Sequence, residues 1–277
     1  MTALEVVRAA PGLDEYLADV EVELGRSVGR YPGLVREVGA GALAAGGKRL
    51  RPALAFLSSS PDAEPPVAAG VAVELVHMAT LVHDDLIDGA VVRRGRAAAW
   101  SEHGEDAARA SGDYLFARAF AVLAETGDAS LVAVLADASL ALARGEAMQR
   151  RQRHDPDTSI EDYLERCALK TGKLFEAACV LGGGSGEYGR RLGIAFQIAD
   201  DVLDCTGETA RRRSRCCSLR RQTRSCATRS PGVRRKVSSS ASRRAARSTG
   251  LVSWPSTTLR RPGPASTACR VGTSSRR

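Results

Sequence analysis

Two short acidic segments of the same form carry the residues best suited to chemistry. They read 84-DDLID-88 and, 116 residues later, 200-DDVLD-204. In a helix, residues i and i+4 lie on the same face, about 6 Å apart along the axis. Asp84 and Asp88 therefore share one face, and so do Asp200 and Asp204. Like charges at this spacing destabilise a bare helix, and one such segment could equally be a solvated acidic face. Its recurrence predicts bound cations, and hard carboxylate oxygens that share an ion with a phosphate suit Mg²⁺ best.

A basic segment supplies the opposite charge. In 47-GKRLRP-52, Lys48, Arg49 and Arg51 stand together where a helix is expected to begin. Backbone N–H groups at a helix start also attract anions. The segment therefore predicts a phosphate site, although a basic helix start taken alone is more often a solvated surface.

Helices must position these residues, since no alternating strand pattern of useful length occurs. Residues 67–88 form a long apolar segment that ends in the first acidic box, so we expect a central, buried helix. Further helical patterns fill much of 14–58 and cover 105–125, 129–154, 159–181 and 187–205. This organisation predicts an all-α fold, a bundle of antiparallel helices.

Composition supports a globular protein outside the membrane. Apolar residues make up 44% of the 277 residues and aromatic residues only 4%, which leaves alanine, leucine and valine to fill the core. No run of 18 apolar residues occurs, and the first residues carry acids where a signal peptide needs a basic stretch. We therefore expect a cytoplasmic protein with no transmembrane segment.

The formal charge of +8 hides two unlike parts. Residues 211–277 contain 18 Arg and one Lys with no Asp or Glu, so the remaining residues carry a net charge of −11. Helical periodicity also stops after Glu208, and the tail is rich in Arg, Ser, Cys and Thr. We expect a helical domain over residues 1–209 and no stable packed domain over residues 210–277.

Five motifs in order resemble those of the trans-isoprenyl diphosphate synthases, also called polyprenyl synthetases. They are GGKRLRP, ELVHMATLVHDDLIDGAVVRRG, GDYLFARAF, KTGKLFEAA and GIAFQIADDVLD, and the resemblance covers roughly residues 15–208. It implies an isoprenoid-synthase helix bundle around a deep apolar cavity, with the two acidic boxes facing each other across its mouth. It also implies a homodimer.

The resemblance further implies head-to-tail (1′-4) prenyl transfer. An allylic diphosphate ionises and isopentenyl diphosphate adds to the carbocation, with three Mg²⁺ ions holding the leaving diphosphate. Positive charge placed where negative charge develops, together with dry apolar walls, suits such a reaction. The implied metal site consists of Asp84, Asp85, Asp88, Asp200, Asp201 and Asp204, of which Asp84, Asp88 and Asp200 are the direct ligands and, with Lys170, the catalytic residues.

The substrate-binding residues are implied by motif position. Those expected to hold isopentenyl diphosphate are Lys48, Arg51, His77 and Arg94. Those expected at the allylic diphosphate are Arg93, Lys170 and Gln197, with Thr171 beside the reacting carbon. Taken alone, a histidine such as His77 is more often a core residue. Arg93 and Arg94 could likewise be a pair of surface residues.

Four further polar residues lie near these motifs. His83 and Lys173 receive no role. Glu146 and Gln149 resemble a site-lining segment of the family, but a helix-surface position explains them equally well.

Product length is partly encoded just before the first box. In the family, the residues four and five positions before the first Asp form the floor under the growing chain, and bulky aromatic residues there stop growth early. Here they are Thr80 and Ala79, both small. The resemblance therefore predicts geranylgeranyl diphosphate or a longer polyprenyl diphosphate.

The chain departs from the family after 200-DDVLDCTGE-208. The family continues with a Gly-Lys-x-x-Gly-x-Asp-Leu segment and several more helices, which are absent here. When high-GC codons are chosen, the tail read in a shifted frame from the third base of Arg212 can encode an amphipathic helix with Leu-Pro in place of the family's Thr-Leu-Pro. We infer a frameshift and expect low or no activity from this chain. An intact single frame with unrelated codons across codons 204–215 would exclude it.

Two other hypotheses remain. A genuine tail with 19 positive charges would bind an anionic partner, nucleic acid or acidic membrane, with steep salt dependence. However, Trp254 is its only aromatic residue and it contains no nucleic-acid motif, so we expect no nucleic-acid binding. The chain could instead be an inactive relative or a partner subunit of a two-component synthase, although such partners generally lack the acidic boxes.

Overall fold

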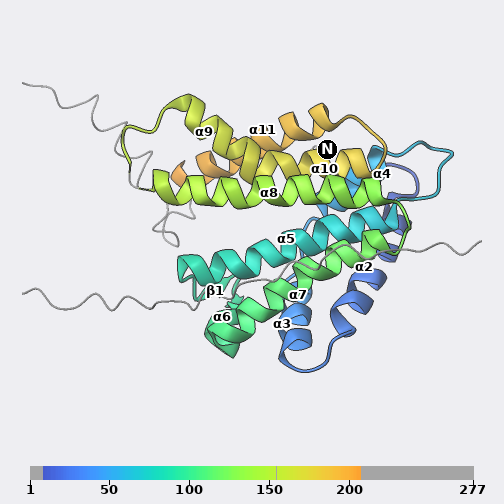
Figure 1. The fold of residues 1–277 in the computed structure, drawn as a ribbon, viewed down its shortest axis with the longest axis horizontal. Coiled ribbons are helices and arrows are strands. Elements are labelled where there is room, and N and C mark those ends of the chain that lie inside the picture. Colours follow the sequence, from blue (N-terminus) through green and yellow to red (C-terminus); the bar gives the residue numbers. More distant parts are fainter. Residues whose placement is uncertain (1–8, 154, 207–277) are drawn as a thin grey trace, which may run out of the picture. The chain divides into compact units, whose positions relative to one another are not determined.

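A computed structural model describes residues 9–153 and 155–206, all within the unit Met1–Arg229. The described chain is helical, as predicted, and only one two-stranded hairpin interrupts it (Figure 1). The helices are α2 (Leu13–Gly29), α3 (Leu34–Ala44), α4 (Leu50–Leu57), α5 (Val67–Asp88), α6 (Ala99–His103), α7 (Glu105–Ala124), α8 (Ala129–Gln152), α9 (Ile160–Cys167), the π-helix η1 (Ala168–Gly172), α10 (Lys173–Leu181) and α11 (Gly186–Thr206). The predicted basic tail lies outside the described residues.

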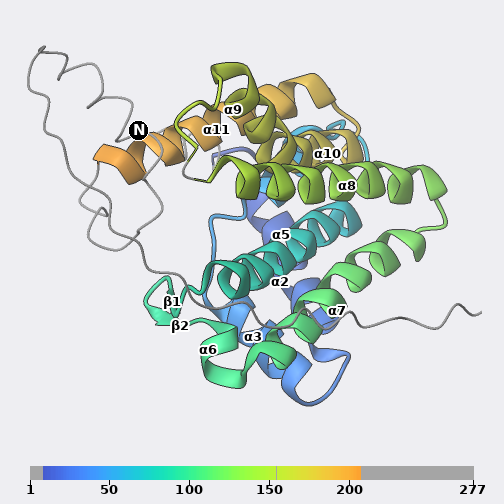
Figure 2. The same ribbon diagram turned by 60° about the vertical axis from the view of Figure 1, so that its left-hand side comes forward.

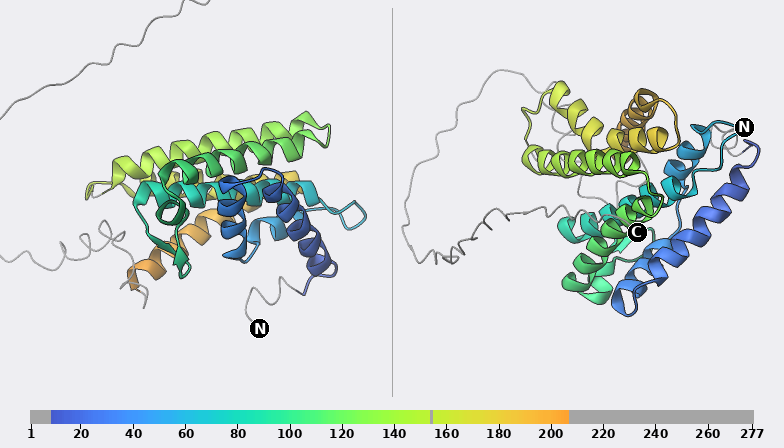
Figure 3. Two further views of the ribbon diagram at one scale, coloured as in Figure 1. Left: turned by 90° about the horizontal axis from the view of Figure 1, so that it is seen from below. Right: turned by 45° about the vertical axis from the view of Figure 1, so that its right-hand side comes forward.

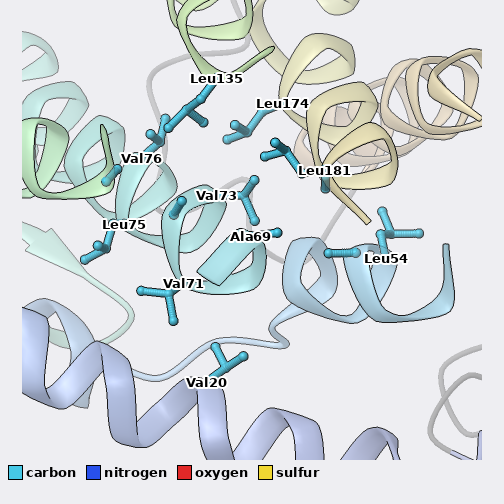
Figure 4. Close-up of a cluster of buried hydrophobic side chains, with 14 of the residues drawn as sticks. Val20, Leu54, Ala69, Val71, Val73, Leu75, Val76, Leu135, Leu174 and Leu181 are labelled. Atoms are coloured by element: carbon cyan, nitrogen blue, oxygen red, sulfur yellow. The ribbon is translucent and has the colours of Figure 1, made fainter. Parts of the chain in front are cut away.

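Helix α5 forms the centre of the described bundle. It contacts α2, α4, α7 and α10, and the right-hand view of Figure 3 shows α5 and α7 between α2 and α3 on one side and α8–α11 on the other. Its apolar side chains point in several directions, with Val71 toward α2 and Val76 toward α8 (Figure 4). Burial of this kind stabilises a helix that is apolar on most sides.

The burial of α5 also explains its hydropathy. The helix is long and apolar enough to cross a membrane, but 61% of its most apolar window is buried within the protein. That fits the prediction of a core helix.

Local capping residues explain where several helices begin and end. The side chain of Asp128 accepts a hydrogen bond from Ser130 N (2.8 Å) at the start of α8, and Ser159 Oγ accepts one from Asp162 N (3.0 Å) at the start of α9. Helix α5 ends at Gly89, whose φ of 63° is the left-handed conformation that glycine tolerates. The first acidic box is thus the last turn of α5.

A short hairpin follows the first box. Strands β1 (Val92–Arg93) and β2 (Arg96–Ala97) pair antiparallel, with Val92 opposite Ala97. The hairpin turns the chain back so that Arg93 lies near the end of α5.

The helix predicted over 159–181 is divided by η1, the π-helical segment that carries Lys170 and Thr171. Glycines on both neighbouring helices allow this segment to lie close to them. A Cβ atom on Gly145 of α8 would lie 2.7 Å from Lys170 N, and one on Gly193 of α11 would lie 2.7 Å from the Cα of Gly172. Close approach of backbones requires glycine at such positions. π-Helical turns also occur frequently at functional sites.

Candidate active site

The C-terminal ends of α5, α8 and α11 lie on the same side of the described bundle (Figures 1 and 2). The first acidic box forms the end of α5 and the second lies at the end of α11. The candidate site is built from these ends together with η1 and β1.

Asp84 lies in a cluster of charges. Lys170 Nζ is 3.5 Å from Asp84 Oδ2 and also forms an ion pair with Glu146 of α8. The Asp84 side chain is only 19% exposed, and burial raises the pKa of its carboxyl group. Lys170 opposes this shift, whereas the negative charges of Glu146 and Asp88 add to it. Lys170 therefore offsets only part of the cost of burying the Asp84 charge, and a further cation would stabilise the ionised carboxylate.

Asp88 has a different cationic partner. Arg153, which directly follows α8, places its Nη2 atom 2.6 Å from Asp88 Oδ1. The Asp88 side chain is 6% exposed and the Arg153 side chain 45% exposed. The two outer carboxylates of the first box are therefore each held by a basic side chain, one from η1 and one from the end of α8.

The second aspartate of the box, Asp85, faces the hairpin. Arg93 Nε donates a hydrogen bond to Asp85 Oδ2 (2.6 Å), and the Asp85 side chain is 6% exposed. Its other oxygen, Oδ1, is buried without a hydrogen-bond partner among the described residues. An unsatisfied buried carboxylate oxygen costs free energy, which a ligand could recover.

The second box is anchored in a similar way. Gln197 Nε2 donates to Asp201 Oδ1 (2.9 Å) and the Tyr163 hydroxyl donates to Asp201 Oδ2 (2.8 Å). Arg166 of α9 lies 3.8 Å from the same carboxylate, and its guanidinium stacks over the Tyr163 ring at 5.0 Å. The side chain of Asp200 is exposed, and that of Asp204 lies outside the described residues.

Segment η1 connects the two boxes through adjacent residues. Lys170 pairs with Asp84 of the first box, while the Thr171 hydroxyl donates to Gln197 Oε1 (2.5 Å). Gln197 in turn holds Asp201. Two carboxylate clusters, 116 residues apart in the sequence, are therefore brought to one place by a five-residue segment.

A second group of predicted residues gathers around His77 of α5. Burial lowers the pKa of its imidazole well below the ordinary value of 6.5, and four guanidinium groups lower it further: those of Arg51, Arg94, Arg93 and Arg49. Such an accumulation of positive charge around a neutral histidine favours an anion. Lys48 is exposed on the loop before α4, whereas the Nε atom of Arg51 is buried and has no hydrogen-bond partner among the described residues.

Two arginines of this group are fixed by unusual contacts. Arg51 lies with its guanidinium carbon 4.9 Å from the Phe175 ring centre, and burial lowers its pKa to about 10, still protonated at neutral pH. Arg94, with a φ of 49°, donates to the carbonyl oxygen of Gly46. This bond ties the hairpin to the basic loop, so the hairpin and the start of α4 face one position.

Arg49 is the residue of the basic segment to which the sequence assigned no separate role. It adopts a left-handed conformation (φ 47°) and is 9% exposed. Its guanidinium pairs with Glu21 of α2 and, at 2.8 Å, with the buried Glu74 of α5. Arg49 therefore fixes the loop that carries Lys48 onto α5 one turn before His77.

The other ambiguous residues are also located. Glu146 lines the site through Lys170, which favours the site-lining interpretation. His83 lies 3.4 Å from Asp113 on α7, and Lys173 pairs with Asp137 and Glu176, so neither points to the acidic boxes. Sequence reasoning did not identify Tyr163, Arg166 or Arg153, whose only signal was a charged or polar side chain in helices of unknown orientation.

The residues present are a reasonable fit for Mg²⁺ only in company with a phosphate. Among the described residues, no three His, Cys, Asp or Glu side chains come together closely enough to hold a metal ion. Mg²⁺ usually binds through one or two carboxylates, keeps several waters and takes its other ligands from substrate phosphates. Asp84 and Asp88, with the unpartnered oxygen of Asp85 behind them, provide that kind of donor set.

The described residues also form an open apolar groove between α8 and the η1–α10 segment. It has a volume of about 670 Å³ and is lined by Asp137, Leu140, Ala141, Ala143, Arg144, Ala147, Leu169 and Lys173. The deep cavity that the resemblance implies stays a prediction.

Fold and site together define an all-α bundle with two aspartate boxes and a group of basic side chains at one end (Figures 1 and 2). The chain belongs to the polyprenyl synthetase family, whose model matches residues 33–218. The predicted family is thereby confirmed, and so is the predicted fold class, because the solved structures of similar proteins share the bundle.

Three similar proteins illustrate the relationship. The chain is 40% identical over 209 residues to heptaprenyl diphosphate synthase component 2 of Geobacillus stearothermophilus, covering 70% of this chain and 65% of that protein. The structure of a decaprenyl diphosphate synthase from Rhodobacter capsulatus superposes with a TM-score of 0.67 at 36% identity, over 73% of this chain and 67% of that one. The structure of a polyprenyl synthase from Caulobacter crescentus complexed with calcium and isoprenyl diphosphate superposes with a TM-score of 0.65 at 36% identity. The match covers 71% of this chain and 64% of that one.

The match does not extend over whole relatives. The chain spans 57–65% of the length of curated relatives such as the octaprenyl diphosphate synthases of Haemophilus influenzae and Escherichia coli and the Geobacillus protein.

Proposed function

We propose that this chain carries the active-site mouth of a Mg²⁺-dependent prenyltransferase. The enzyme would join an allylic diphosphate to isopentenyl diphosphate and release a polyprenyl diphosphate. The observation that carries the proposal is the contact of Lys170 with Asp84 and of its neighbour Thr171 with Gln197, since it gathers both aspartate boxes at one point. The names of the relatives, which are hepta-, octa- and decaprenyl diphosphate synthases, support the same reaction.

The residues of the mouth suit the departure of a diphosphate group. The allylic C–O bond breaks and its electron pair leaves with the diphosphate. Mg²⁺ ions held by Asp84, Asp88 and Asp200 would neutralise the negative charge that develops on the leaving diphosphate. Lys170 and Arg93 lie beside the first box and supply further positive charge. The similar Caulobacter synthase was solved in complex with calcium and isoprenyl diphosphate, which supports the binding of a cation and a diphosphate here.

The cluster around His77 suits the second diphosphate. Arg51, Arg94 and the neutral imidazole would bind isopentenyl diphosphate, with Lys48 closing over it from the loop. The double bond of isopentenyl diphosphate then attacks the allylic cation to form the new C–C bond, and a proton leaves the adjacent carbon. Thr171, buried between the boxes, would lie near the reacting carbon.

Small residues near the first box favour a long product. Ala79 is fully buried, and the Thr80 hydroxyl is turned back to donate to His77 O (2.8 Å). Neither side chain presents bulk, so we propose a product of geranylgeranyl length or longer. A product that stops at fifteen carbons would contradict this.

The test combines turnover with binding, because the chain spans only 57–65% of the length of these relatives. The whole chain is incubated with Mg²⁺, an allylic diphosphate and labelled isopentenyl diphosphate, and binding of inorganic pyrophosphate in Mg²⁺ is measured by calorimetry. Asp84→Asn should abolish product and weaken pyrophosphate binding, whereas Asp19→Asn, an exposed residue of α2, should change neither. A chain that neither makes product nor binds pyrophosphate would refute the proposal.

A second candidate function is that of one component of a two-subunit synthase. The 40% identity to a protein named heptaprenyl diphosphate synthase component 2 favours it. The presence of both aspartate boxes would make this chain the catalytic component. Pyrophosphate binding without turnover by the isolated chain, and turnover after a second component is added, would distinguish this candidate from a self-sufficient homodimer.

A further inference from the structure

Both outer carboxylates of the first box are covered by basic side chains. Lys170 lies against Asp84 and Arg153 against Asp88, one helical turn further along α5. The two cations come from different elements, η1 and the end of α8. A divalent ion that binds these carboxylates must either displace Lys170 and Arg153 or share the carboxylates with them.

Arg153 is placed to take a new partner after such displacement. Its side chain is 45% exposed, and its backbone directly follows the last turn of α8, so the guanidinium is tethered at the mouth but not buried. A divalent ion that arrives with a diphosphate places a new anion, the diphosphate, close to the displaced guanidinium. Guanidinium groups bind phosphate oxygens in a two-pronged geometry that strengthens and orients the contact.

We propose that Arg153 is a further diphosphate-binding residue, held on Asp88 until Mg²⁺ and the allylic diphosphate enter. This inference rests on the proposed function of the mouth. It gives Arg153 the same relation to Asp88 that Lys170 has to Asp84. Arg153 therefore weakens Mg²⁺ binding alone and strengthens binding of the diphosphate.

These two effects have opposite signs and can be separated. The whole chain is titrated by calorimetry with MgCl₂ alone, and then with inorganic pyrophosphate at saturating Mg²⁺. In Arg153→Met, Mg²⁺ affinity should rise by about two- to fivefold because a competing ion pair is lost. Pyrophosphate affinity should fall by about tenfold because a charge-assisted hydrogen bond is lost. Arg153→Lys keeps the positive charge but not the two-pronged guanidinium geometry, so both of its affinities should lie between those of the wild type and Arg153→Met.

The matched control is Arg151→Met. Arg151 lies in the last turn of α8 and is exposed, and its side chain makes no hydrogen bond or ion pair to any described residue. It tests whether a lost positive charge near the mouth is sufficient, and both affinities should stay within about twofold of wild type.

Other outcomes overturn the inference. A rise in Mg²⁺ affinity with unchanged pyrophosphate affinity would make Arg153 a competitor only, and a fall in both would make it a support for the box. Equal losses in Arg151→Met would indicate a general charge effect. Wild-type protein that binds no pyrophosphate would refute the proposed function itself, whereas tight wild-type binding that Arg153→Met leaves intact refutes only the role of Arg153.

Discussion

The environment of His77 predicts a specific pH dependence of stability. Burial and the guanidinium groups of Arg51, Arg94, Arg93 and Arg49 lower the pKa of folded His77 well below the ordinary value of 6.5, which the unfolded chain retains. As the pH falls through 6.5, the unfolded chain takes up a proton that the folded protein does not. The contribution of His77 to stability is therefore fully present above pH 6.5 and is lost as the pH decreases.

The magnitude follows from that proton. If His77 stays neutral in the folded protein, lowering the pH from 7.5 to 5.5 should cost about 1.4 kcal/mol in the free energy of unfolding through this residue alone. Glutamine at position 77 is polar and does not titrate, so His77→Gln should remove this dependence. All other titrating groups are common to both proteins, and the difference between the two curves isolates His77.

The assay is urea unfolding followed by circular dichroism at half-unit steps between pH 5.5 and pH 7.5. The wild-type protein should lose stability relative to His77→Gln by about 1.4 kcal/mol over this range, whatever their offset at pH 7.5. Two parallel curves would refute the reasoning, because they would mean that His77 binds its proton equally well in both states. A difference of opposite sign would mean that an anionic group dominates the position.

Three further variants test the contacts around the site. Glu74→Gln should destabilise the protein by about 1.5–3 kcal/mol, because the buried guanidinium of Arg49 would lose one of its two carboxylate partners and keep Glu21. Tyr163→Phe should cost about 1.5–3 kcal/mol, the loss of one hydrogen bond to the Asp201 carboxylate. Gly145→Ala should cost about 1–3 kcal/mol, because the added methyl group would meet the backbone of η1. Each is measured as a free energy of unfolding in urea at pH 7.5.

The corresponding controls change the same atoms in open positions. Tyr188→Phe, at a side chain 60% exposed, should change stability by less than about 0.5 kcal/mol. Gly25→Ala lies within α2 with no atom within 4 Å of the new methyl group, and should stabilise the helix by about 0.5–1 kcal/mol. If Gly145→Ala behaves like Gly25→Ala, the close packing of η1 against α8 is incorrect.

The sequence predicted the helices well because their signals are local. The apolar segment 67–88 is α5 itself, and the segments predicted at 105–125 and 129–154 are α7 (Glu105–Ala124) and α8 (Ala129–Gln152). Apolar periodicity, capping residues and glycine at position 89 act within a few residues of the chain. The break of 159–181 into α9, η1 and α10 was not predicted, since it depends on neighbouring helices.

The carboxylate clusters could also be predicted from the sequence, since Asp84 and Asp88 share a face by helical spacing alone. The side chains that pair with these carboxylates could not be predicted. Which cation reaches Asp88, which hydroxyl holds Asp201, and whether Arg49 is solvated or buried depend on how α8, α9 and α2 pack.

Residue types and their spacing thus determined the helices, the two carboxylate clusters and the family. Only the tertiary structure decided which charges neutralise one another, because ion pairs and hydrogen bonds require contact between side chains that are far apart in the sequence. Segment η1 is the clearest case. Two adjacent residues, Lys170 and Thr171, connect boxes 116 residues apart only because glycines on α8 and α11 let their backbones approach.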